Sequence, residues 1–415
     1  MRQRRATSRA ATLLDVRPLR ESPAFLRLWV GTTLSVFGSQ LASFAVLFLV
    51  WERTGNAALV GAIGGAQAVP MLVFALLGGR IADSVDRRTL VIVIRVGQLL
   101  ASTMLAAVVI SGTASVVPIF VVIAIQSGLN AVGAPASKTF VPRLLSGERL
   151  SAGLALTNLS FQISMLAGPL VGGLVIAWSG VGPCLVANPI AFVFALYGVA
   201  RLPSMRPKGS GTETPGSGFF AAARLVARTP VLIGAFATDL CVTLLSMPVA
   251  LFPVINAERY GGSSVTLGLF QPALAIGGVL AGTFSGRITR SRKQGLVMLV
   301  SGGIWGVALV AFGAADRLWL ALPALALAGA ADVASVVSRA TLVQEATPDA
   351  YRGRVNAIDY LVGVGGPQLG NLRAGVVASA TGGAASAMLG GLAAALGVAS
   401  IALGIPAVRR YRRSE

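Results

Sequence analysis

Three acidic residues and three arginines lie inside long apolar stretches of this 415-residue chain, where charged side chains are costly. Asp332 and Arg339 share one stretch, and Asp239 and Asp359 lie in two others. A carboxyl group that faces an apolar cavity can take up a proton and release it when its surroundings change. For Asp239 and Asp332, proton coupling or substrate contact and a structural salt bridge are therefore equally favoured alternatives.

The positions of these residues along their predicted helices separate them. Asp332 lies halfway along a helix predicted over 318–345, and Arg339 lies two turns later, about 10 Å away on nearly the same face. That separation is too long for direct pairing but suits one polar stripe. Asp359 and Arg95 lie near predicted cytoplasmic helix ends, and a structural role is favoured for both. Their side chains can reach the membrane surface or pair with the loop that contains Asp83.

Uncharged polar side chains inside apolar stretches are further candidates for lining a substrate cavity. The alternative for each is a hydrogen bond that holds one helix to another. The candidates are Gln126, Asn130, Gln162 and Gln271.

Composition excludes several classes of protein. Hydrophobic residues make up 55% of the chain and charged residues only 12%, too few for the surface of a soluble enzyme. The chain has no His, and its two Cys residues lie in apolar runs without metal-ligand spacing, so we expect no cofactor and no metal. No phosphate-binding loop of a primary pump is present, and a membrane-embedded lipid enzyme is a less favoured alternative because no acid-base cluster is found.

Runs of about 20 apolar residues predict an all-α polytopic membrane protein with twelve transmembrane helices. Their predicted extents are 26–51, 59–79, 89–111, 115–134, 151–178, 182–200, 230–255, 265–285, 295–314, 318–345, 355–381 and 386–406.

The basic residues give this prediction an orientation. The net charge is +19, but the basic residues form short clusters between spans rather than one patch, so no nucleic-acid partner is expected. Alternate connections hold 28 of the 34 Lys and Arg residues, whereas the opposite connections hold only Arg53, Arg259 and Arg317. Cytoplasmic loops carry such an excess, so both termini are predicted to be cytoplasmic, in a multi-pass inner (plasma) membrane protein. The Arg-rich first 24 residues also fit a transit peptide, but a cytoplasmic tail is favoured.

A long polar connection rich in Pro and Gly divides the spans into six plus six. The predicted organisation is a tail (1–25), a six-helix bundle (26–201), a central loop (202–229), a second six-helix bundle (230–406) and a tail (407–415). Gly79-Arg80-Ile81 recurs as Gly286-Arg287-Ile288, and Pro142 and Gly147 recur as Pro348 and Gly353. An even number of spans in each half predicts two pseudo-symmetric bundles in the same orientation, which can rock about a shared site.

Two glycine-containing motifs connect the chain to a family. The loop from Gly78 to Arg88 resembles the cytoplasmic signature of the major facilitator superfamily at Gly79, Asp83 and Arg87, followed by Arg88, and departs from it at Ser84 and Asp86. Asp83 is expected to accept hydrogen bonds from a neighbouring helix end or Arg. The Gly-Pro-x-x-Gly-Gly sequence in the fifth span resembles a motif of the superfamily's antiporters, with Ser164 in place of the leading Gly of that motif. The matching residues are Gly168, Pro169, Gly172 and Gly173. Close helix packing is the simpler explanation for these residues.

Shorter pieces resemble one branch, the drug-type proton antiporters that include siderophore exporters. They are Trp51 to Gly55, Leu251 to Pro253, Thr347-Pro348 with Gly353 to Asn356, and Arg373 to Gly375. This resemblance implies a major facilitator fold and the export of small amphipathic molecules, such as siderophores or drugs, by proton antiport. The expected partners of the protein are a small-molecule substrate, protons and the lipid bilayer. The protein itself is expected to be a monomer. Uptake is the alternative direction, and the fourth span has no charge, so the branch's coupling Arg cannot be assigned here.

Overall fold

The computed structural model describes residues 15–112, 115–206 and 217–411, with the backbone alone described at 76–77, 79–80, 82–83, 217–219, 285 and 287. Within these residues the fold is all-helical, as predicted. The long helices are α2 (Pro23–Thr54), α3 (Ala57–Ser84), α4 (Arg87–Ile110), α5 (Val117–Lys138), α7 (Glu148–Ser179), α8 (Gly182–Ala200), α10 (Pro230–Ser246), α12 (Ser264–Thr283), α14 (Gln294–Ala314), α15 (Leu318–Ala346), α16 (Arg352–Thr381) and α17 (Gly383–Gly404).

Helix bounds follow the local sequence. The side chains of Ser22, Asn56 and Ser263 cap α2, α3 and α12 by accepting hydrogen bonds from backbone amides of the first turn. Gly55 ends α2 in the left-handed conformation (φ 57°), which glycine adopts without strain. By length and composition, eleven helical segments in the described ranges can cross a membrane, and α16 is the twelfth long helix. Twelve spanning helices agree with the prediction.

The seventh span is not one continuous helix, and the predicted helix over 230–255 was wrong in this respect. The helix α10 ends at Ser246, Met247 is extended, and the chain continues through the short η1 (Val249–Leu251) into α11 (Phe252–Arg259). Pro248 causes the break, because proline disfavours helical geometry in the residue before it and supplies no amide hydrogen. Asn371 Oδ1 accepts a hydrogen bond from the Ala250 amide at 3.1 Å, so α16 satisfies one donor at the break.

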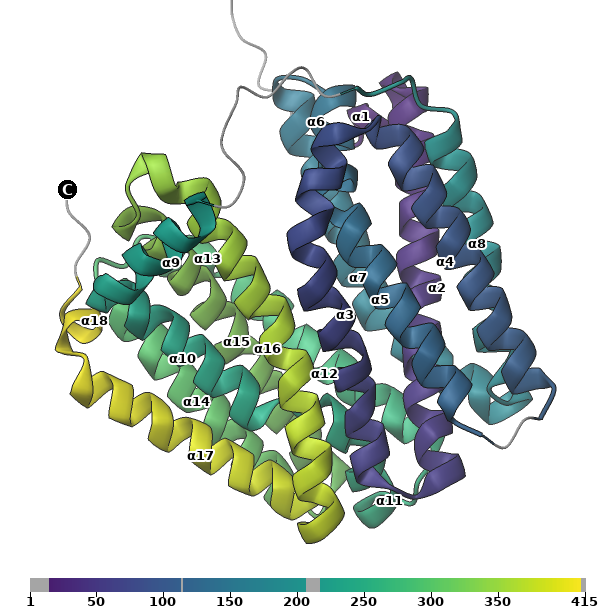
Figure 1. The fold of residues 1–415 in the computed structure, drawn as a ribbon. Coiled ribbons are helices and arrows are strands. Elements are labelled where there is room, and N and C mark those ends of the chain that lie inside the picture. Colours follow the sequence, from purple (N-terminus) through teal and green to yellow (C-terminus); the bar gives the residue numbers. More distant parts are fainter. Residues whose placement is uncertain (1–14, 113–114, 207–216, 412–415) are drawn as a thin grey trace, which may run out of the picture.

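The helices form two halves (Figure 1), an N-half with α2 to α8 and a C-half with α10 to α18. In the N-half α2 and α4 pack on α8, and α3 and α4 pack on α5; in the C-half α14 packs on α15 and α17, and α10 packs on α16. Short helices cover the ends: α1 (Arg17–Glu21), α6 (Phe140–Leu144), α9 (Ser217–Arg228), α13 (Ser285–Thr289) and α18 (Pro406–Arg410).

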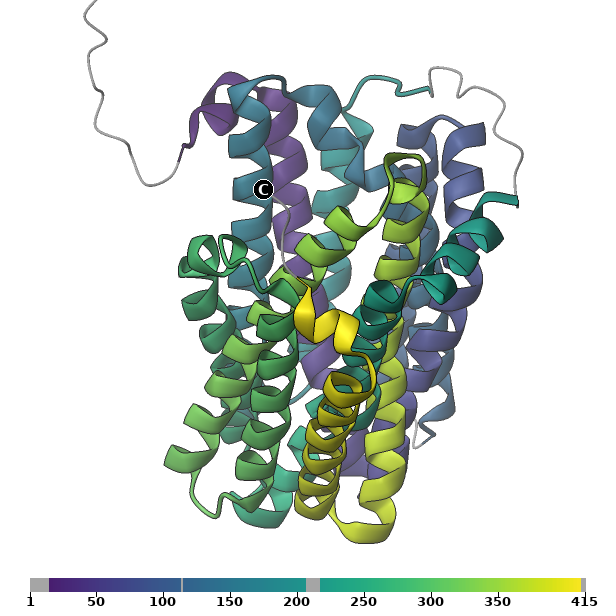
Figure 2. The ribbon, with the colours of Figure 1, turned by 90° about the vertical axis from the view of Figure 1, so that its left-hand side faces the viewer.

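The two ends of the bundle differ. One end, here called the basic end, carries α1, α6, α9, α13 and α18, whereas α11 lies at the opposite end (Figures 1 and 2). The halves join through α3 against α16 and α7 against α12, and near α11 also through α2. Toward the basic end the helices of the halves diverge in Figure 1. One contact still links the halves there, since the Lys138 ammonium lies 4.4 Å from the centre of the Tyr360 ring.

Glycines allow the close approach of the halves, and we call these two contacts the glycine seams. A Cβ added at Gly61 on α3 would lie 2.8 Å from the Asn371 carbonyl oxygen and from the Gly375 Cα on α16. On α7, a Cβ added at Gly173 would lie 2.6 Å from the Ser264 carbonyl oxygen of α12. The Ser264 hydroxyl also donates a hydrogen bond to the Gly173 carbonyl at 3.0 Å. Neither seam therefore has room for larger residues at these positions.

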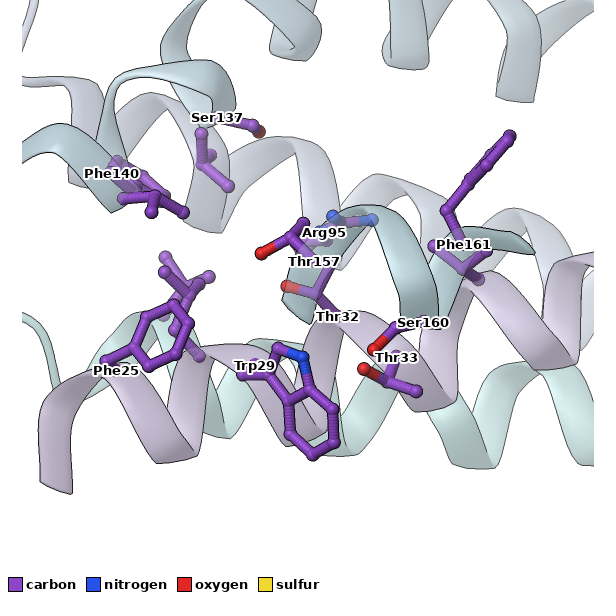
Figure 3. Close-up of a pocket in the computed structure, with 15 residues that line it drawn as sticks. Phe25, Trp29, Thr32, Thr33, Arg95, Ser137, Phe140, Thr157, Ser160 and Phe161 are labelled. Carbon is purple, nitrogen blue, oxygen red and sulfur yellow. The ribbon is translucent and has the colours of Figure 1, made fainter. Parts of the chain in front are cut away.

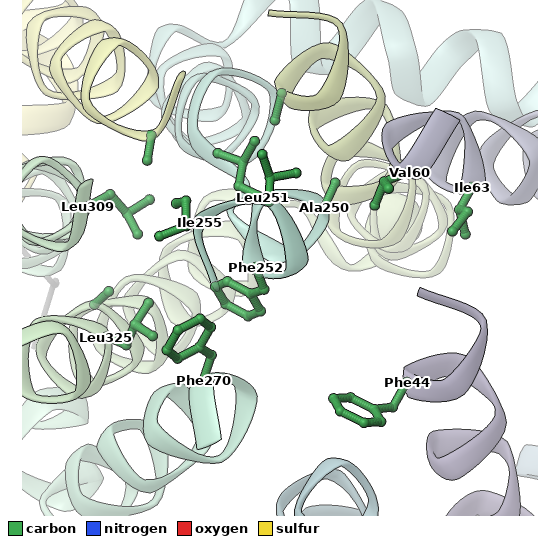
Figure 4. Close-up of a cluster of buried hydrophobic side chains, with 14 of the residues drawn as sticks. Phe44, Val60, Ile63, Ala250, Leu251, Phe252, Ile255, Phe270, Leu309 and Leu325 are labelled. Carbon is green, nitrogen blue, oxygen red and sulfur yellow. The ribbon is translucent and has the colours of Figure 1, made fainter. Parts of the chain in front are cut away.

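Aromatic packing fixes the C-half near α11. Phe252, Phe270 and Phe312 are fully buried, and their ring centres lie 5.5 to 5.9 Å apart in edge-to-face pairs. Figure 4 shows Phe252 and Phe270 with Leu325 beside them. Nearby, the Glu258 carboxylate accepts hydrogen bonds from the Gly383 and Ala384 amides at the start of α17. This end of the C-half is thus held by both apolar packing and charge at a helix N-terminus.

Candidate functional site

A buried ion network joins three helices of the C-half. Arg339 on α15 donates a hydrogen bond from Nη1 to Asp359 Oδ1 on α16 at 2.5 Å. Its Nε lies 3.5 Å from Asp239 Oδ1 on α10, in an ion pair without a hydrogen bond. Arg339 and Asp239 are buried, and Asp359 is partly exposed. The packing of α10 and α16 against each other places both acids beside one arginine.

Asp332 lies on the same helix as Arg339, and electrostatic interactions connect it to both Arg339 and Asp239. In the described structure it is partly buried and makes neither a hydrogen bond nor an ion pair. Asp239 Oδ2 and Arg339 Nε are buried and have no hydrogen-bond partner there. Two carboxylates thus contact one guanidinium, a third carboxyl group lies on the same helix as that guanidinium, and the polar atoms among them are incompletely satisfied. Such a cluster can change its number of bound protons, since one positive charge cannot balance three carboxylates.

The N-half contains the larger of two cavities, about 420 Å³ in volume. Gln126 and Asn130 on α5 line it, as do Gln40 on α2 and Gln67 on α3. The C-half closes one side of this cavity through α16, whose lining residues are Tyr360, Val364 and Gln368. A cavity of this size, whose lining mixes apolar side chains with many polar ones, can hold a small polar or amphipathic molecule.

A second cavity of about 220 Å³ shares Val36, Arg95 and Phe161 with the larger one. Figure 3 shows Trp29, Thr33 and Arg95 among the side chains around it. Arg95 donates a hydrogen bond to Gln98 Oε1 at 3.0 Å, and its guanidinium lies 5.8 Å from the centre of the Phe192 ring. Arg95 is thus the charged residue between the two cavities.

Sequence analysis placed Asp332 and Arg339 on nearly the same face of one helix, but it did not bring Asp239 or Asp359 to them. In the structure Asp239 and Asp359 both form ion pairs with Arg339. Gln162 on α7 and Gln271 on α12 line neither of the two cavities. Sequence analysis did not predict that Arg95 lines the cavities. Arg95 is the ninth residue of α4, and an arginine at that depth in a span could have indicated a role in a cavity.

The signature loop is anchored by Asp86, a residue that departs from the family pattern. Asp86 caps α4 by accepting from the Arg88 and Thr89 amides at 2.9 and 3.1 Å. Its Oδ2 accepts from the Met205 amide at 2.9 Å and from the Ser204 hydroxyl. Arg88 donates from Nη2 to the Ala200 carbonyl at 2.6 Å. The loop therefore ties α4 to the segment after α8.

Electrostatics agrees with this anchoring role. Partial burial raises the pKa of Asp86, but the hydrogen bonds from Ser204, Thr89, Met205 and Arg88 outweigh it and leave the pKa below its ordinary value. Gly79 belongs to α3, and the side chain of Asp83 lies outside the described residues, as does its expected contact. Arg87 lies at the start of α4, and its amide donates to the Met205 carbonyl at 3.3 Å.

The glycine-proline element on α7 faces two helices. A Cβ at Gly168 would lie 2.5 Å from Gln40 Cβ, and one at Gly172 would lie 2.7 Å from the Phe44 ring, both on α2. Gly173 faces α12, and the Pro169 carbonyl lies against Gly268 of the same helix. Close helix packing, the simpler of the two expected roles, accounts for these contacts.

Comparison with curated proteins finds exporters. The chain is 25% identical to the "Enterobactin exporter EntS" of Shigella boydii serotype 4 (strain Sb227) over 358 residues, 86% of each chain. It is also 25% identical to the "Enterobactin exporter EntS" of Citrobacter koseri over 363 residues, 88% of this chain and 87% of that protein.

Solved transporters share the fold. The crystal structure of the nucleoside transporter NupG matches 94% of this chain and 100% of its own with a TM-score of 0.74 and 14% identity. A bacterial homologue of the iron transporter ferroportin, in its inward-facing state, matches 90% of this chain and 98% of its own with a TM-score of 0.65 and 16% identity. At such identities the likeness establishes the fold alone.

A family model described as a transmembrane secretion effector matches residues 15–413, nearly the whole chain. With the fold and the multi-pass helices described above, this match means that the chain belongs to the transmembrane secretion effector family of the major facilitator superfamily of transporters.

Proposed function

We propose that the protein is a secondary active transporter that exports small amphipathic molecules by proton antiport. The observation that carries this proposal is the buried network of Arg339, Asp239 and Asp359 with Asp332 nearby. Buried acids facing one arginine are costly unless a proton neutralises part of their charge. A change in their surroundings would then release that proton.

Alternating access would link the proton to the substrate. The network lies in the C-half, but Asp359 and the cavity-lining Tyr360 are neighbours on α16. A movement of α16 against the N-half would therefore change both the cavity and the surroundings of the acids. Binding of substrate to one arrangement and of the proton to the other would couple the two fluxes.

Export is favoured because the relatives described above are enterobactin exporters. We propose siderophore-class or drug-class molecules as substrates, and enterobactin is the first probe. The protein would be reconstituted into liposomes with an acidic lumen, and substrate entry and lumen pH would be followed together. An antiporter accumulates the probe and makes the lumen more alkaline. Accumulation only when the outside is acidic would instead support the uptake alternative.

The acids are tested separately in this assay. We expect Asp239→Asn or Asp332→Asn to abolish transport driven by the pH gradient, because an amide cannot take up the proton. Asp316→Asn is the matched control, since Asp316 is an exposed acid outside the network. If both network variants keep gradient-driven transport, the assignment of proton coupling to these two acids is wrong.

We also propose that the basic end faces the cytoplasm of a cell with an inner (plasma) membrane. Arg88, Arg143 and Arg201 lie at this end, and cytoplasmic loops carry such an excess of Arg and Lys. Single cysteines at Ser204 and at Asp316, an exposed residue beside α11, would be introduced after both native cysteines are replaced and labelled in intact spheroplasts with a membrane-impermeant maleimide. Labelling is expected at position 316 alone, and the opposite pattern would reverse the orientation.

A further inference from the structure

The two N-half cavities have a polar lining of one electrical sign. Arg95 lines both, and neither cavity is lined by Asp or Glu among the residues that the structure describes. Arg95 forms no ion pair in those ranges; its side chain contacts Gln98 and the Phe192 ring, both uncharged. A charge inside a spanning helix is costly without a partner. The unpaired guanidinium of Arg95 therefore favours the binding of a negatively charged ligand.

Unsatisfied polar atoms gather around the same space. Trp29 Nε1, Thr33 Oγ1, Arg95 Nε and Gln126 Nε2 are buried and lack hydrogen-bond partners in the described structure. Each belongs to a residue that lines one or both cavities. The indole and guanidinium nitrogens only donate, and the amide nitrogen of Gln126 also donates. A ligand that supplies acceptor oxygens would satisfy these atoms, and buried polar groups are normally satisfied.

The rest of the lining mixes aromatic and aliphatic side chains with uncharged polar ones. Phe161 lines both cavities, and Phe192 and Tyr360 line the larger one. The guanidinium of Arg95 would bind the acidic group of a ligand, and the aromatic side chains would pack against an aromatic ring that carries this group. The acids of the C-half network line neither cavity.

We propose that the N-half cavities form a binding site for amphipathic anions, with Arg95 binding the acidic group of an aromatic carboxylate, sulfonate or acidic phenol. This inference deepens the proposed function, because it rests on the protein being a transporter of small molecules. It names the charge of the substrate and the residue that recognises it.

A matched series of probes tests the charge preference. The ligands are 1-naphthoate, 1-naphthamide and 1-naphthylmethylammonium, which share one ring system and differ in charge. Their binding to the protein in phosphatidylcholine nanodiscs would be measured by equilibrium dialysis, with empty nanodiscs subtracted. We expect naphthoate to bind roughly tenfold or more tightly than naphthamide, as a hydrogen-bonded charge predicts, and the ammonium to bind most weakly.

Variants assign the preference to Arg95. Arg95→Gln is expected to reduce naphthoate affinity to that of naphthamide, and Arg95→Lys to keep most of the preference. Arg373→Gln is the control, because Arg373 is another arginine of a long helix, lines neither cavity and donates to the Leu245 carbonyl. Equal affinity of the wild-type protein for the three probes, no measurable naphthoate binding, or an unchanged preference in a folded Arg95→Gln protein would overturn the proposal.

Two further readouts separate related explanations. Nanodiscs with added phosphatidylglycerol show whether a lipid phosphate competes with naphthoate, and competition lost in Arg95→Gln would support the anion site with lipid as one source. Gradient-driven transport is measured on the same preparations. Anion preference without proton-driven transport would refute the proposed function and leave the site standing, whereas proton-driven transport without anion preference would do the reverse.

Discussion

The two halves of the molecule differ in what surrounds the arginine inside each of them. In the C-half, Arg339 lies against Asp239 and Asp359, with Asp332 on the same helix. In the N-half, Arg95 lies between two cavities whose described linings contain no acid. One arginine is surrounded by acids within the protein, and the other has only uncharged contacts. This difference underlies our proposals that the C-half acids couple protons and that the N-half cavities bind the transported molecule.

The largest effect should come from removing Arg339, and removing Arg95 provides the comparison. Arg339→Gln leaves buried acids without their positive partner, and breaking such a pair costs about 3–5 kcal/mol of stability. Arg95→Gln strands no acid, so we expect a loss of less than about 1 kcal/mol. Thermal unfolding in detergent measures both. Equal losses in the two variants would remove the contrast between the halves.

A second change asks whether the loss in Arg339→Gln arises from stranded acids. Adding Asp359→Asn to Arg339→Gln removes one of them and should recover part of the lost stability. Arg317→Gln is the control, because Arg317 is exposed at the start of α15. A double variant no more stable than the single one would mean that the arginine contributes by packing.

The glycine seams should give the next largest effect. Gly61→Ala places a methyl group 2.8 Å from backbone atoms of α16, and such overpacking typically costs about 1–3 kcal/mol. The halves would separate near α11, and transport would slow. Gly303→Ala on α14 has open space and should change neither property. Transport rates in liposomes, with cysteine labelling near α11 for separation, distinguish the two variants.

A smaller effect is expected from one cavity amide. Gln126→Leu removes an unpartnered donor that lines the larger cavity, and the lost hydrogen bond of about 1 kcal/mol would weaken naphthoate binding about fivefold. Gln271→Leu on α12 lies outside both cavities and should leave the affinity unchanged. Equal weakening in both variants would argue against a site in the N-half.

The smallest effect concerns Asp86 at the basic end. Because its folded-state pKa is depressed, its stabilising contribution is present above the ordinary carboxyl pKa and is lost as the pH falls through the folded value. Asp86→Ala should cost about 1 kcal/mol near neutral pH, as loss of a helix cap does. The difference in melting temperature from the wild-type protein should shrink below about pH 4. A difference that is constant with pH would mean that the carboxylate charge is unimportant.

Sequence patterns predicted the helices better than their contacts. Apolar runs located the spans, because a helix that crosses a membrane needs about 20 apolar residues whatever surrounds it. The break at Met247 and Pro248 was missed, although proline was visible, because neighbouring helices decide whether a proline bends or interrupts a span. Asn371, which satisfies the freed Ala250 amide, is distant in sequence.

The candidate site was predicted in the same uneven way. Spacing placed Asp332 and Arg339 on one face of a helix, but it could not bring Asp239 and Asp359 to them from two other helices. These helices are apolar on nearly all sides, so periodicity does not show which face meets a cavity. For that reason Gln126 and Gln162 were equal candidates, and of the two only Gln126 lines one of the cavities described above.

The seam of α3 and α16 has a consequence for how fast the halves can move. At Gly61 and Gly375 the touching atoms are backbone, so a rocking motion there requires no side chain to change its rotamer. Large interdigitated side chains would have to leave their rotamers and be ordered again in every transport cycle, and each reordering would cost conformational entropy. At these two positions α3 and α16 meet through backbone atoms alone, so a movement of one helix along the other would carry little of that entropic cost there.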